Sequence, residues 1–179
     1  MRQPELRKAI ASALGVALEH SGAIPALAAA SPPAGTRVLL VEDDPINGTI
    51  ARAMLESLGC AVIQAVNGRQ AVELASPGGI DVVLMDCQMP EMDGFAATRA
   101  IRTYEQVRAG GGGPTRPVPI IALTANAMQG DRERCLAAGM DDYLSKPFTR
   151  ADLGSRLAHW TNRAPSRAAR SEQEGAVAG

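Results

Sequence analysis

Aromatic side chains are scarce in this sequence. They make up 3% of the 179 residues, whereas hydrophobic residues of all kinds make up 46%. A folded domain therefore needs a core of aliphatic residues and alanine, and the length suffices for one domain with tails. The net charge of −1 lacks the positive excess that binding to a nucleic-acid backbone requires, so we expect no nucleic-acid partner.

Cysteine is also rare, and its spacing excludes the usual cysteine-based architectures. The three cysteines, Cys60, Cys87 and Cys135, are odd in number and form no Cys-x-x-Cys pair. Neither a zinc site nor a disulfide framework is indicated, and a reducing cytoplasm is the simplest location. No apolar run reaches 18 residues, so we expect no membrane contact by this segment.

The two ends of the chain differ in composition from its centre. Apolar residues recur with a helical period over residues 4–20, and we expect an amino-terminal helix within residues 1–20. Residues 21–35 are rich in Ala, Pro, Gly and Ser, which is typical of a linker. Residues 162–179 contain only Val177 as a sizeable apolar residue, and we expect a disordered tail.

Between these ends, strand-like and helix-like segments alternate over residues 36–161. This alternation predicts a parallel sheet with helices on both faces. The predicted strands are residues 37–41, 61–65, 82–85, 119–123 and 142–145, and the predicted helices are residues 46–58, 69–76, 95–107, 129–138 and 151–161. Residues 109–117 contain four consecutive glycines and two prolines, which predicts a flexible loop.

The third predicted strand runs directly into an acid. Its residues, Val82 to Met85, are all apolar, and Asp86 follows them. A continuous apolar run is typical of a strand buried on both faces, and open α/β sheets place their chemistry at the carboxyl ends of such strands. Taken alone, Asp86 is interpreted equally well as a cap of the following turn. The polar residues after the other strands help to decide whether Asp86 takes part in chemistry or only caps the turn.

Polar side chains follow four of the five predicted strands, and a parallel sheet brings them to one edge. Crowded carboxylates repel one another, which favours a bound cation, and hard oxygen ligands suit Mg²⁺ better than zinc or copper. A carboxylate beside Mg²⁺ and a lysine can attack a phosphoryl group as a nucleophile. The residues concerned are Glu42, Asp43 and Asp44 after the first strand, Asp86 after the third, Thr124 after the fourth and Lys146 after the fifth.

These motifs, in this order and spacing, resemble the receiver domains of two-component response regulators and hybrid sensor histidine kinases. The matching residues are the acidic pair Glu42-Asp43, the Asp-x-x-Met-Pro-x-Met-Asp-Gly motif of residues 86–94, Thr124-Ala125 and Lys146-Pro147-Phe148. Residues 122–148 resemble the receivers of hybrid kinases most strongly. The resemblance covers residues 36–161 and implies an α/β, flavodoxin-like (βα)5 fold, a three-layer sandwich around a parallel sheet of order 2-1-3-4-5.

The resemblance also implies how the phosphoryl group is handled. Asp86 is expected to accept it, and Thr124 and Lys146 to contact it. Tyr143 matches the position of an aromatic switch residue, which is expected to follow Thr124 when phosphorylation pulls that threonine inward. The alternative for Tyr143 is a half-buried packing residue without a switching role.

A metal site is implied by the same resemblance. The side chains of Asp43 and Asp86 and the backbone carbonyl of Gln88 are expected to bind Mg²⁺, and Glu42 is expected to act through a water molecule. Asp44 lies one residue beyond the acidic pair, so no metal role is expected for it.

The implied function is that of a phosphoacceptor receiver in a phosphorelay, with a histidine kinase or a histidine phosphotransfer protein as partner. Such a module is not an enzyme in isolation beyond its own phosphorylation and dephosphorylation, and its parent chain would be a hybrid histidine kinase. The sequence leaves open whether it dimerises. A Mg²⁺-dependent phosphohydrolase is the enzymatic alternative, but the haloacid-dehalogenase-like ones need a second Asp where Gln88 stands. A degenerate receiver used only for binding is a third alternative, and the complete acid, Thr and Lys set argues against it.

The start of the chain resembles the last helix of a receiver. Residues 1–11 and 148–158 both follow the pattern apolar-x-x-x-acid-Leu-x-x-x-aliphatic-Ala. We therefore hypothesise that residues 1–20 end a preceding receiver domain. The alternative is an ordinary amphipathic helix that packs on a partner or pairs with itself.

Overall fold

The computed structural model describes residues 31–111, 116–125 and 129–162. The predicted amino-terminal helix, most of the predicted linker and all but the first residue of the predicted tail lie outside these ranges. Within them, no helix is long and apolar enough to cross a membrane.

The centre of the molecule is a five-stranded parallel sheet of order β2-β1-β3-β4-β5. This order confirms the predicted flavodoxin-like architecture. The chain moves outward from β1 to one edge, returns to pair β3 with β1, and then builds the other edge. The strands are β1 (Arg37–Val41), β2 (Ala61–Ala65), β3 (Val82–Asp86), β4 (Ile120–Thr124) and β5 (Asp142–Ser145).

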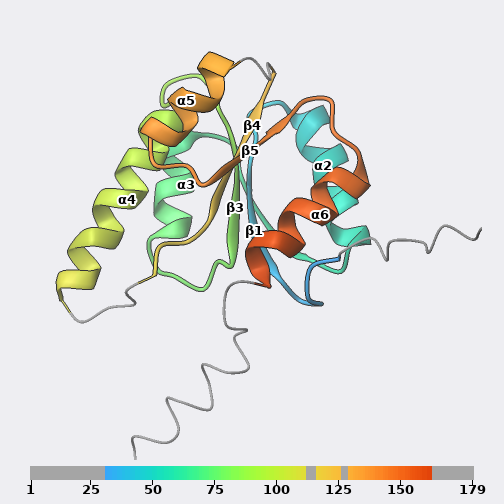
Figure 1. The fold of residues 1–179 in the computed structure, drawn as a ribbon, viewed down its shortest axis with the longest axis horizontal. Helices are drawn as coiled ribbons and strands as arrows, with labels where there is room; N and C mark the ends of the chain where they lie inside the picture. The colour runs from blue at the N-terminus through green and yellow to red at the C-terminus, as the bar shows by residue number, and fades with distance from the viewer. Residues whose placement is uncertain (1–30, 112–115, 126–128, 163–179) are drawn as a thin grey trace, which may run out of the picture.

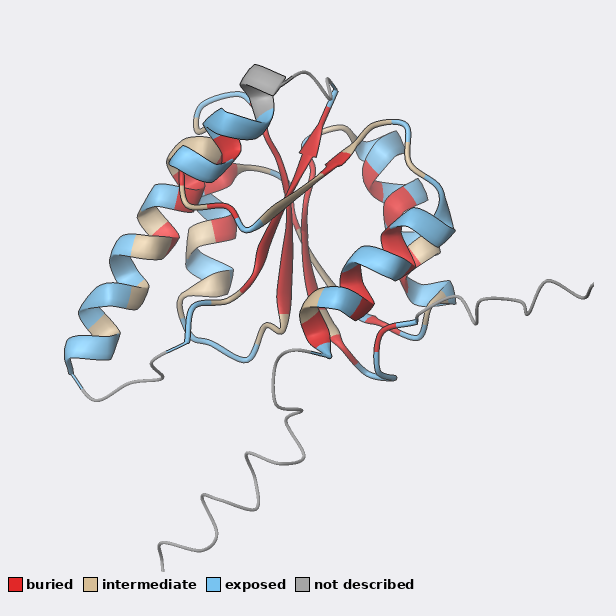
Figure 2. Cartoon of the chain, in the orientation of Figure 1, coloured by how far each residue is buried: buried red, intermediate tan, exposed pale blue. Residues whose placement is uncertain are grey.

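Helices cover both faces of the sheet, which makes three layers (Figure 1). On one face lie α2 (Pro45–Ser57) and α6 (Arg150–Thr161). On the other lie α3 (Gly68–Ala75), α4 (Gly94–Gly110) and α5 (Gln129–Ala137). The three central strands are buried along nearly their whole length (Figure 2), as expected for strands covered on both faces.

The sheet divides the core into two hydrophobic clusters. Successive side chains of a strand point to opposite faces. Accordingly, Val38 and Leu40 of β1 join the cluster under α2 and α6, whereas Leu39 and Val41 join the cluster under α3, α4 and α5. Aliphatic residues, alanine and cysteine fill both clusters, and the cluster under α3, α4 and α5 also contains buried methionines, in line with the scarcity of aromatics.

The predicted boundaries differ from the structure by at most one residue, except at the end of α4. The sequence predicts a loop from residue 109, but α4 continues through Gly110. Arg108 stabilises this last turn because its guanidinium donates a hydrogen bond to the carbonyl of Ser76 at 2.8 Å and lies 5.9 Å from the ring centroid of Tyr104. The four-glycine run predicts a flexible loop, but α4 includes its first glycine, and the hydrogen bond from Arg108 to Ser76 is the tertiary contact of this turn.

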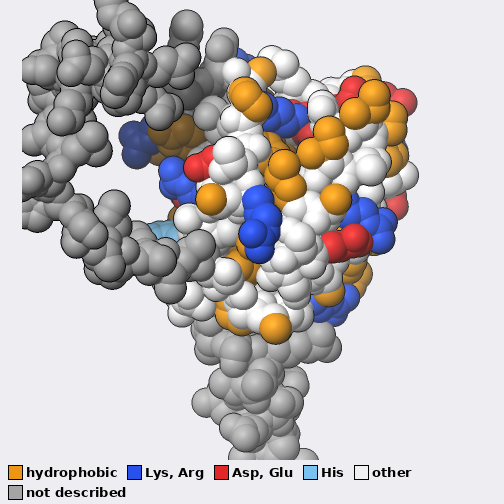
Figure 3. Space-filling model, turned by 90° about the vertical axis from the view of Figure 1, so that its right-hand side faces the viewer, with side chains coloured by type: hydrophobic (Ala, Val, Ile, Leu, Met, Phe, Trp, Pro, Cys, Tyr) orange, Lys and Arg blue, Asp and Glu red, His pale blue; other side chains and the backbone are white. Residues whose placement is uncertain are grey.

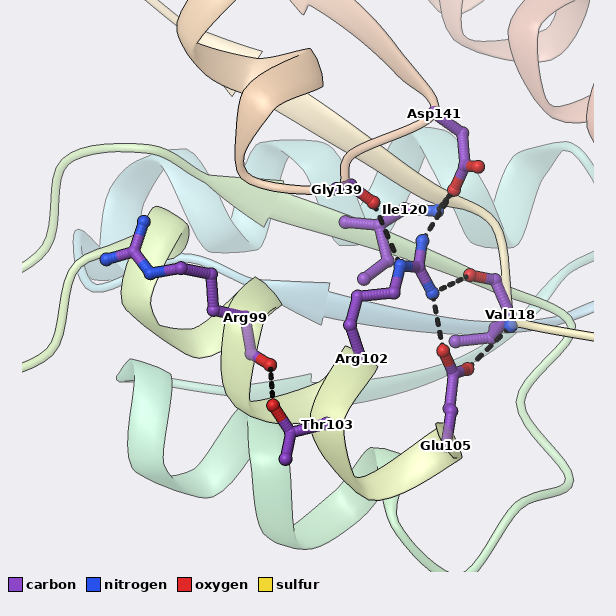
Figure 4. Close-up of polar contacts among 8 residues, drawn as sticks. All are labelled: Arg99, Arg102, Thr103, Glu105, Val118, Ile120, Gly139 and Asp141. Carbon is purple, nitrogen blue, oxygen red and sulfur yellow. Dashed lines mark hydrogen bonds and ion pairs between the residues drawn. The ribbon is translucent and has the colours of Figure 1, made fainter. Parts of the chain in front are cut away.

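Arg102 of α4 ties together the amino-terminal ends of β4 and β5 (Figure 4). Its guanidinium donates to the carbonyls of Gly139 and Val118, both at 2.9 Å, and pairs with Glu105 and Asp141, both at 2.7 Å. Asp141 also accepts from the backbone N–H of Ile120, and Glu105 from that of Val118. This network lies at the end of the sheet opposite Asp86, the last residue of β3.

Candidate functional site

The predicted site residues meet at the carboxyl ends of β1, β3, β4 and β5. Asp86 is the last residue of β3 and Thr124 the last residue of β4. Glu42 directly follows β1 and Lys146 directly follows β5. Parallel strands that run in one direction end at one edge, so residues far apart in sequence become neighbours.

Lys146 bridges two acids at the centre of the site. Its Nζ donates to Glu42 Oε2 at 2.7 Å and to Asp86 Oδ2 at 2.6 Å, across sequence separations of 104 and 60 residues. The exposed side-chain fractions are 23% for Lys146, 2% for Glu42 and 10% for Asp86. Two largely buried carboxylates thus share one ammonium group, which partly offsets their mutual repulsion.

Burial and charge act in opposite directions on these groups. Loss of hydration raises the pKa of Glu42, although the hydrogen bond from Lys146 opposes this rise. For Lys146, burial lowers the pKa, but the hydrogen bonds to Asp86 and Glu42 outweigh burial, and the net pKa is raised. Lys146 therefore remains protonated at neutral pH and supplies a fixed positive charge beside Asp86.

Three acids in this site could hold a metal ion. One carboxylate oxygen each from Glu42, Asp43 and Asp86 lie within 4.8 Å of one another. Glu42 and Asp86 are buried, whereas Asp43 is exposed and faces solvent. A set of hard oxygen donors with one open side fits Mg²⁺, which binds few carboxylates and keeps several waters.

The turn after Asp86 is held against the site by the backbone. Asp86 Oδ1 accepts from the N–H of Gln88 at 3.0 Å, which places the predicted metal-binding residue Gln88 beside the carboxylate. Gly94 packs so closely that an added Cβ would collide with the carbonyl oxygen of Asp86. Glu91 adopts φ 66°, in the left-handed region. Asp86 therefore both caps this turn and joins the ion cluster, so its two interpretations are compatible.

Asp44 serves the helix rather than the acid cluster. Its Oδ1 accepts from the backbone N–H groups of Ile46 and Asn47, at 2.8 and 2.9 Å, and so caps α2. Asn47 is a site residue that the sequence did not reveal. Its Nδ2 donates to Glu42 Oε1 at 3.4 Å, a contact that depends on how α2 leaves β1. The one sequence signal for the position of Asn47 is the helix cap at Asp44, because this cap sets the direction in which α2 starts.

Thr124 and Tyr143 lie on neighbouring strands. Thr124 is 7% exposed, and its carbonyl accepts from the N–H of Lys146 at 2.7 Å, so β4 and the Lys146 segment are directly linked. Tyr143 pairs with Ala122 in the β4–β5 register and is half-buried against the cluster under α3, α4 and α5. The switching role expected for Thr124 and Tyr143 stays a prediction, and so does the packing alternative for Tyr143.

A pocket of about 390 Å³ adjoins the site on its α5 side. Its walls come from the turn after Asp86, the end of β4, the start of α4 and α5. Arg134 of α5 stands over the ring of Phe95, 5.0 Å from its centroid. The described lining residues are Cys87, Gln88, Met89, Pro90, Asp93, Phe95, Thr124, Ala125 and Arg134.

The family model of the response regulator receiver domain matches residues 38–158. Among curated proteins, a sensor histidine kinase GacS of Pseudomonas protegens is 41% identical over 137 residues, which cover 74% of this chain and 14% of that protein. The chain spans between 3% and 18% of the lengths of the curated relatives compared.

Two solved structures extend this comparison. The receiver domain of the sensor histidine kinase PA1611 from Pseudomonas aeruginosa is 52% identical with a TM-score of 0.62, over 72% of this chain and 99% of that chain, and it has magnesium coordinated in its active site cleft. A chain from the co-crystal structure of the Saccharomyces cerevisiae phosphotransfer protein Ypd1 with the receiver domain of Ssk1 is 34% identical with a TM-score of 0.68, over 74% and 91% of the two chains.

Proposed function

Because the chain belongs to the response regulator receiver domain family, we propose that Asp86 accepts a phosphoryl group from a phosphohistidine. The observation that carries this proposal is the environment of the Asp86 carboxylate. It lies at a strand end, 2.6 Å from the Lys146 ammonium and within a group of acids that could hold a cation. A nucleophilic carboxylate next to fixed positive charge suits phosphoryl transfer, which depends mainly on positioning and electrostatic stabilisation.

The transfer moves one phosphoryl group between two side chains. A carboxylate oxygen of Asp86 forms a bond to phosphorus while the bond between phosphorus and the histidine nitrogen breaks. The imidazole leaves with the electron pair of that bond and takes up a proton from solvent. Lys146 stabilises negative charge on the phosphoryl oxygens, and the Thr124 hydroxyl donates a hydrogen bond to the acyl phosphate.

We propose that Mg²⁺ is the cation of this site. Asp43 and Asp86 would hold it through their carboxylates, Gln88 through its backbone carbonyl and Glu42 through a water molecule. When bound, Mg²⁺ supplies positive charge that neutralises the phosphoryl oxygens. Asn47 and Lys146 hold Glu42 in place, so the buried acid keeps one orientation when the charge in the site changes.

The signal would leave the site through Thr124 and Tyr143. Movement of the Thr124 hydroxyl toward the acyl phosphate vacates space beside β4, and Tyr143 on the neighbouring strand turns inward. The half-buried position of Tyr143 supports this, because the ring can exchange contacts with the core and with solvent at modest cost. The isolated module acts as a switch and not as an enzyme with turnover. Its parent chain would be a hybrid histidine kinase, with this module in the cytoplasm whether or not the parent is anchored in a membrane.

The phosphohistidine partner would approach over α2. Hydrophobic side chains lie among charged ones on the molecular face that carries this helix (Figure 3), and Ile46 and Ile50 are 69% and 50% exposed. A shallow, mainly apolar pocket runs from Ile50 to Phe148 and also has Glu42 and Lys146 in its lining. A protein that packs on this surface would bring a histidine to Asp86, which supports a histidine phosphotransfer protein or kinase domain as the partner.

Intact-mass measurement tests the proposal. The protein is incubated with Mg²⁺ and acetyl phosphate, and separately with a phosphorylated histidine phosphotransfer protein. We expect one phosphoryl adduct on the native chain and none on Asp86→Asn. Asp44→Asn is the matched control, because it removes a neighbouring acid but keeps a good helix cap, and it should retain the adduct. Continuous hydrolysis of phosphoesters would support a phosphohydrolase, and no adduct from either donor would overturn the proposal.

A further inference from the structure

The fold brings together two thiols that the sequence keeps 48 residues apart. Cys87 Sγ lies 3.9 Å from Cys135 Sγ. Cys87 directly follows Asp86 at the end of β3, and Cys135 lies in α5. No disulfide joins them. The proposed phosphoryl transfer uses neither sulfur, and the cysteine spacing in the sequence does not pair them.

The two thiols differ in their access to solvent. Both belong to the cluster under α3, α4 and α5, and Cys135 is 1% exposed. Cys87 is 5% exposed and forms part of the wall of the 390 Å³ pocket. A small reagent in that pocket therefore meets Cys87 first, with Cys135 directly behind it.

We propose that Cys87 and Cys135 form a redox modification site, which a low-molecular-weight disulfide converts into an intramolecular disulfide bond. This goes beyond the proposed phosphoryl transfer and does not depend on it. The disulfide would join the residue after Asp86 to α5, so the end of β3 and this helix could no longer move independently. Cytoplasmic disulfides are usually transient and redox-sensing, which is the class proposed here.

The reaction proceeds by two thiol–disulfide exchanges. The Cys87 sulfur attacks one sulfur of the small disulfide and loses its proton, and one small thiol leaves. Cys135 then attacks the Cys87 sulfur of this mixed disulfide and loses its proton, and the second small thiol leaves. In total, the two protein thiols lose two protons and two electrons, and these reduce the small disulfide to two thiols.

Little movement is needed for the second exchange. The sulfurs start 3.9 Å apart, and a disulfide bond is about 2.0 Å long. Rotations about the Cα–Cβ bonds, with small shifts of α5, can bring the sulfurs together. Cys60 offers no such reaction, because it lies in the other cluster and burial raises its pKa to about 11.

Thiol mapping of the native chain tests this inference without phosphorylation. The folded protein is treated with hydroxyethyl disulfide, and the remaining thiols are then blocked with N-ethylmaleimide in denaturant. We expect N-ethylmaleimide to label one thiol, that of Cys60. Before labelling, the mass of the oxidised protein should be lower by two hydrogen atoms, and peptide mapping should find one disulfide-linked peptide containing Cys87 and Cys135. Dithiothreitol should restore three thiols. Three blocked thiols after prolonged treatment, or a cross-link that includes Cys60, would overturn the proposal.

Two variants separate the pair from an unrelated oxidation. Cys135→Ala, with its fold checked by circular dichroism, should stop at a mixed disulfide on Cys87, because the resolving thiol is gone. Cys60→Ala should form the same cross-link as the native chain. A Cys135→Ala protein in which Cys87 acquires no adduct would contradict attack through the pocket.

Discussion

Replacing Arg102 by methionine should destabilise the fold by about 3 kcal/mol. Methionine keeps a long apolar side chain but removes the charge and every donor. The two ion pairs, whose acids are 24% and 32% exposed, contribute about 0.5 kcal/mol each at such exposure. The two hydrogen bonds to the carbonyls of Val118 and Gly139 contribute about 1 kcal/mol each, the typical net value for a hydrogen bond inside a protein.

Urea unfolding measures this loss. The single tryptophan, Trp160, donates from Nε1 to Asp142 at 2.9 Å and lies in α6, so its fluorescence reports on loss of the tertiary fold. We expect a lower urea midpoint and an unchanged slope of the unfolding free energy against urea concentration. This combination indicates a change of stability alone. Phosphorylation of the folded variant should persist, because Arg102 lies at the end of the sheet opposite Asp86.

Arg99 provides the matched control. It is an exposed arginine on the same helix, and its guanidinium points away from the Arg102 network (Figure 4). Arg99→Met should change the free energy of unfolding by less than about 0.5 kcal/mol. If the two variants differ by less than about 1 kcal/mol, the network does not stabilise the fold as its geometry implies.

Three further predictions concern the site and its supports. Gly94→Ala should cost at least about 2 kcal/mol and impair phosphorylation, because the new Cβ collides with the backbone carbonyl of Asp86, which cannot rotate away. Thr149→Ala should lower stability at neutral pH through loss of the α6 capping box. Hydrogen bonds from Thr149 lower the pKa of Asp152 in the folded state. The stabilisation by this hydrogen-bonded carboxylate is therefore fully present above the unfolded-state pKa of Asp152, and it is lost as the pH falls through the folded-state pKa of Asp152. Mg²⁺ at ten times its dissociation constant should stabilise the native chain by about 1.4 kcal/mol, and Asp43→Asn should abolish most of that gain in thermal unfolding.

Each of these has its own control. Gly110→Ala should be nearly neutral, because a Cβ there meets nothing within 4 Å. For the cap, a Thr149→Ala deficit that stays constant from neutral to acid pH would contradict the role of Asp152. For the metal, Asp44→Asn should keep the full Mg²⁺ response, and an equal loss in both acid variants would mean that the ion senses overall charge and not a defined site.

The strand and helix pattern could be predicted from the sequence because it is a local property. Apolar runs such as Val82 to Met85 mark strands buried on both faces, and Pro45 and Gly59 bound a helical period. The family motifs supplied the sheet order and the set of site residues. The predicted end of α4 is wrong because a glycine run indicates a loop, whereas the contact from Arg108 to Ser76 depends on the neighbouring helix.

The metal and phosphoryl roles of the site residues, the domain bounds and the amino-terminal helix stay predictions. What the structure adds is placement: one carboxylate oxygen each of Glu42, Asp43 and Asp86 lie within 4.8 Å of one another. The Lys146 ammonium group contacts Glu42 and Asp86. The Lys146 contacts join residues 60 and 104 positions apart in the sequence. They depend on how the whole sheet is assembled, which no local pattern encodes.

The sequence by itself determined which residue types follow each strand and their order along the chain, because residue type and strand propensity are properties of short segments. Only the tertiary structure decided which side chains touch. It placed Asn47 on Glu42, Arg102 across the starts of two strands, and the Cys135 sulfur 3.9 Å from that of Cys87. These contacts arise between elements, where packing of the whole chain sets the distances, and the cysteine pair beside Asp86 is the clearest case.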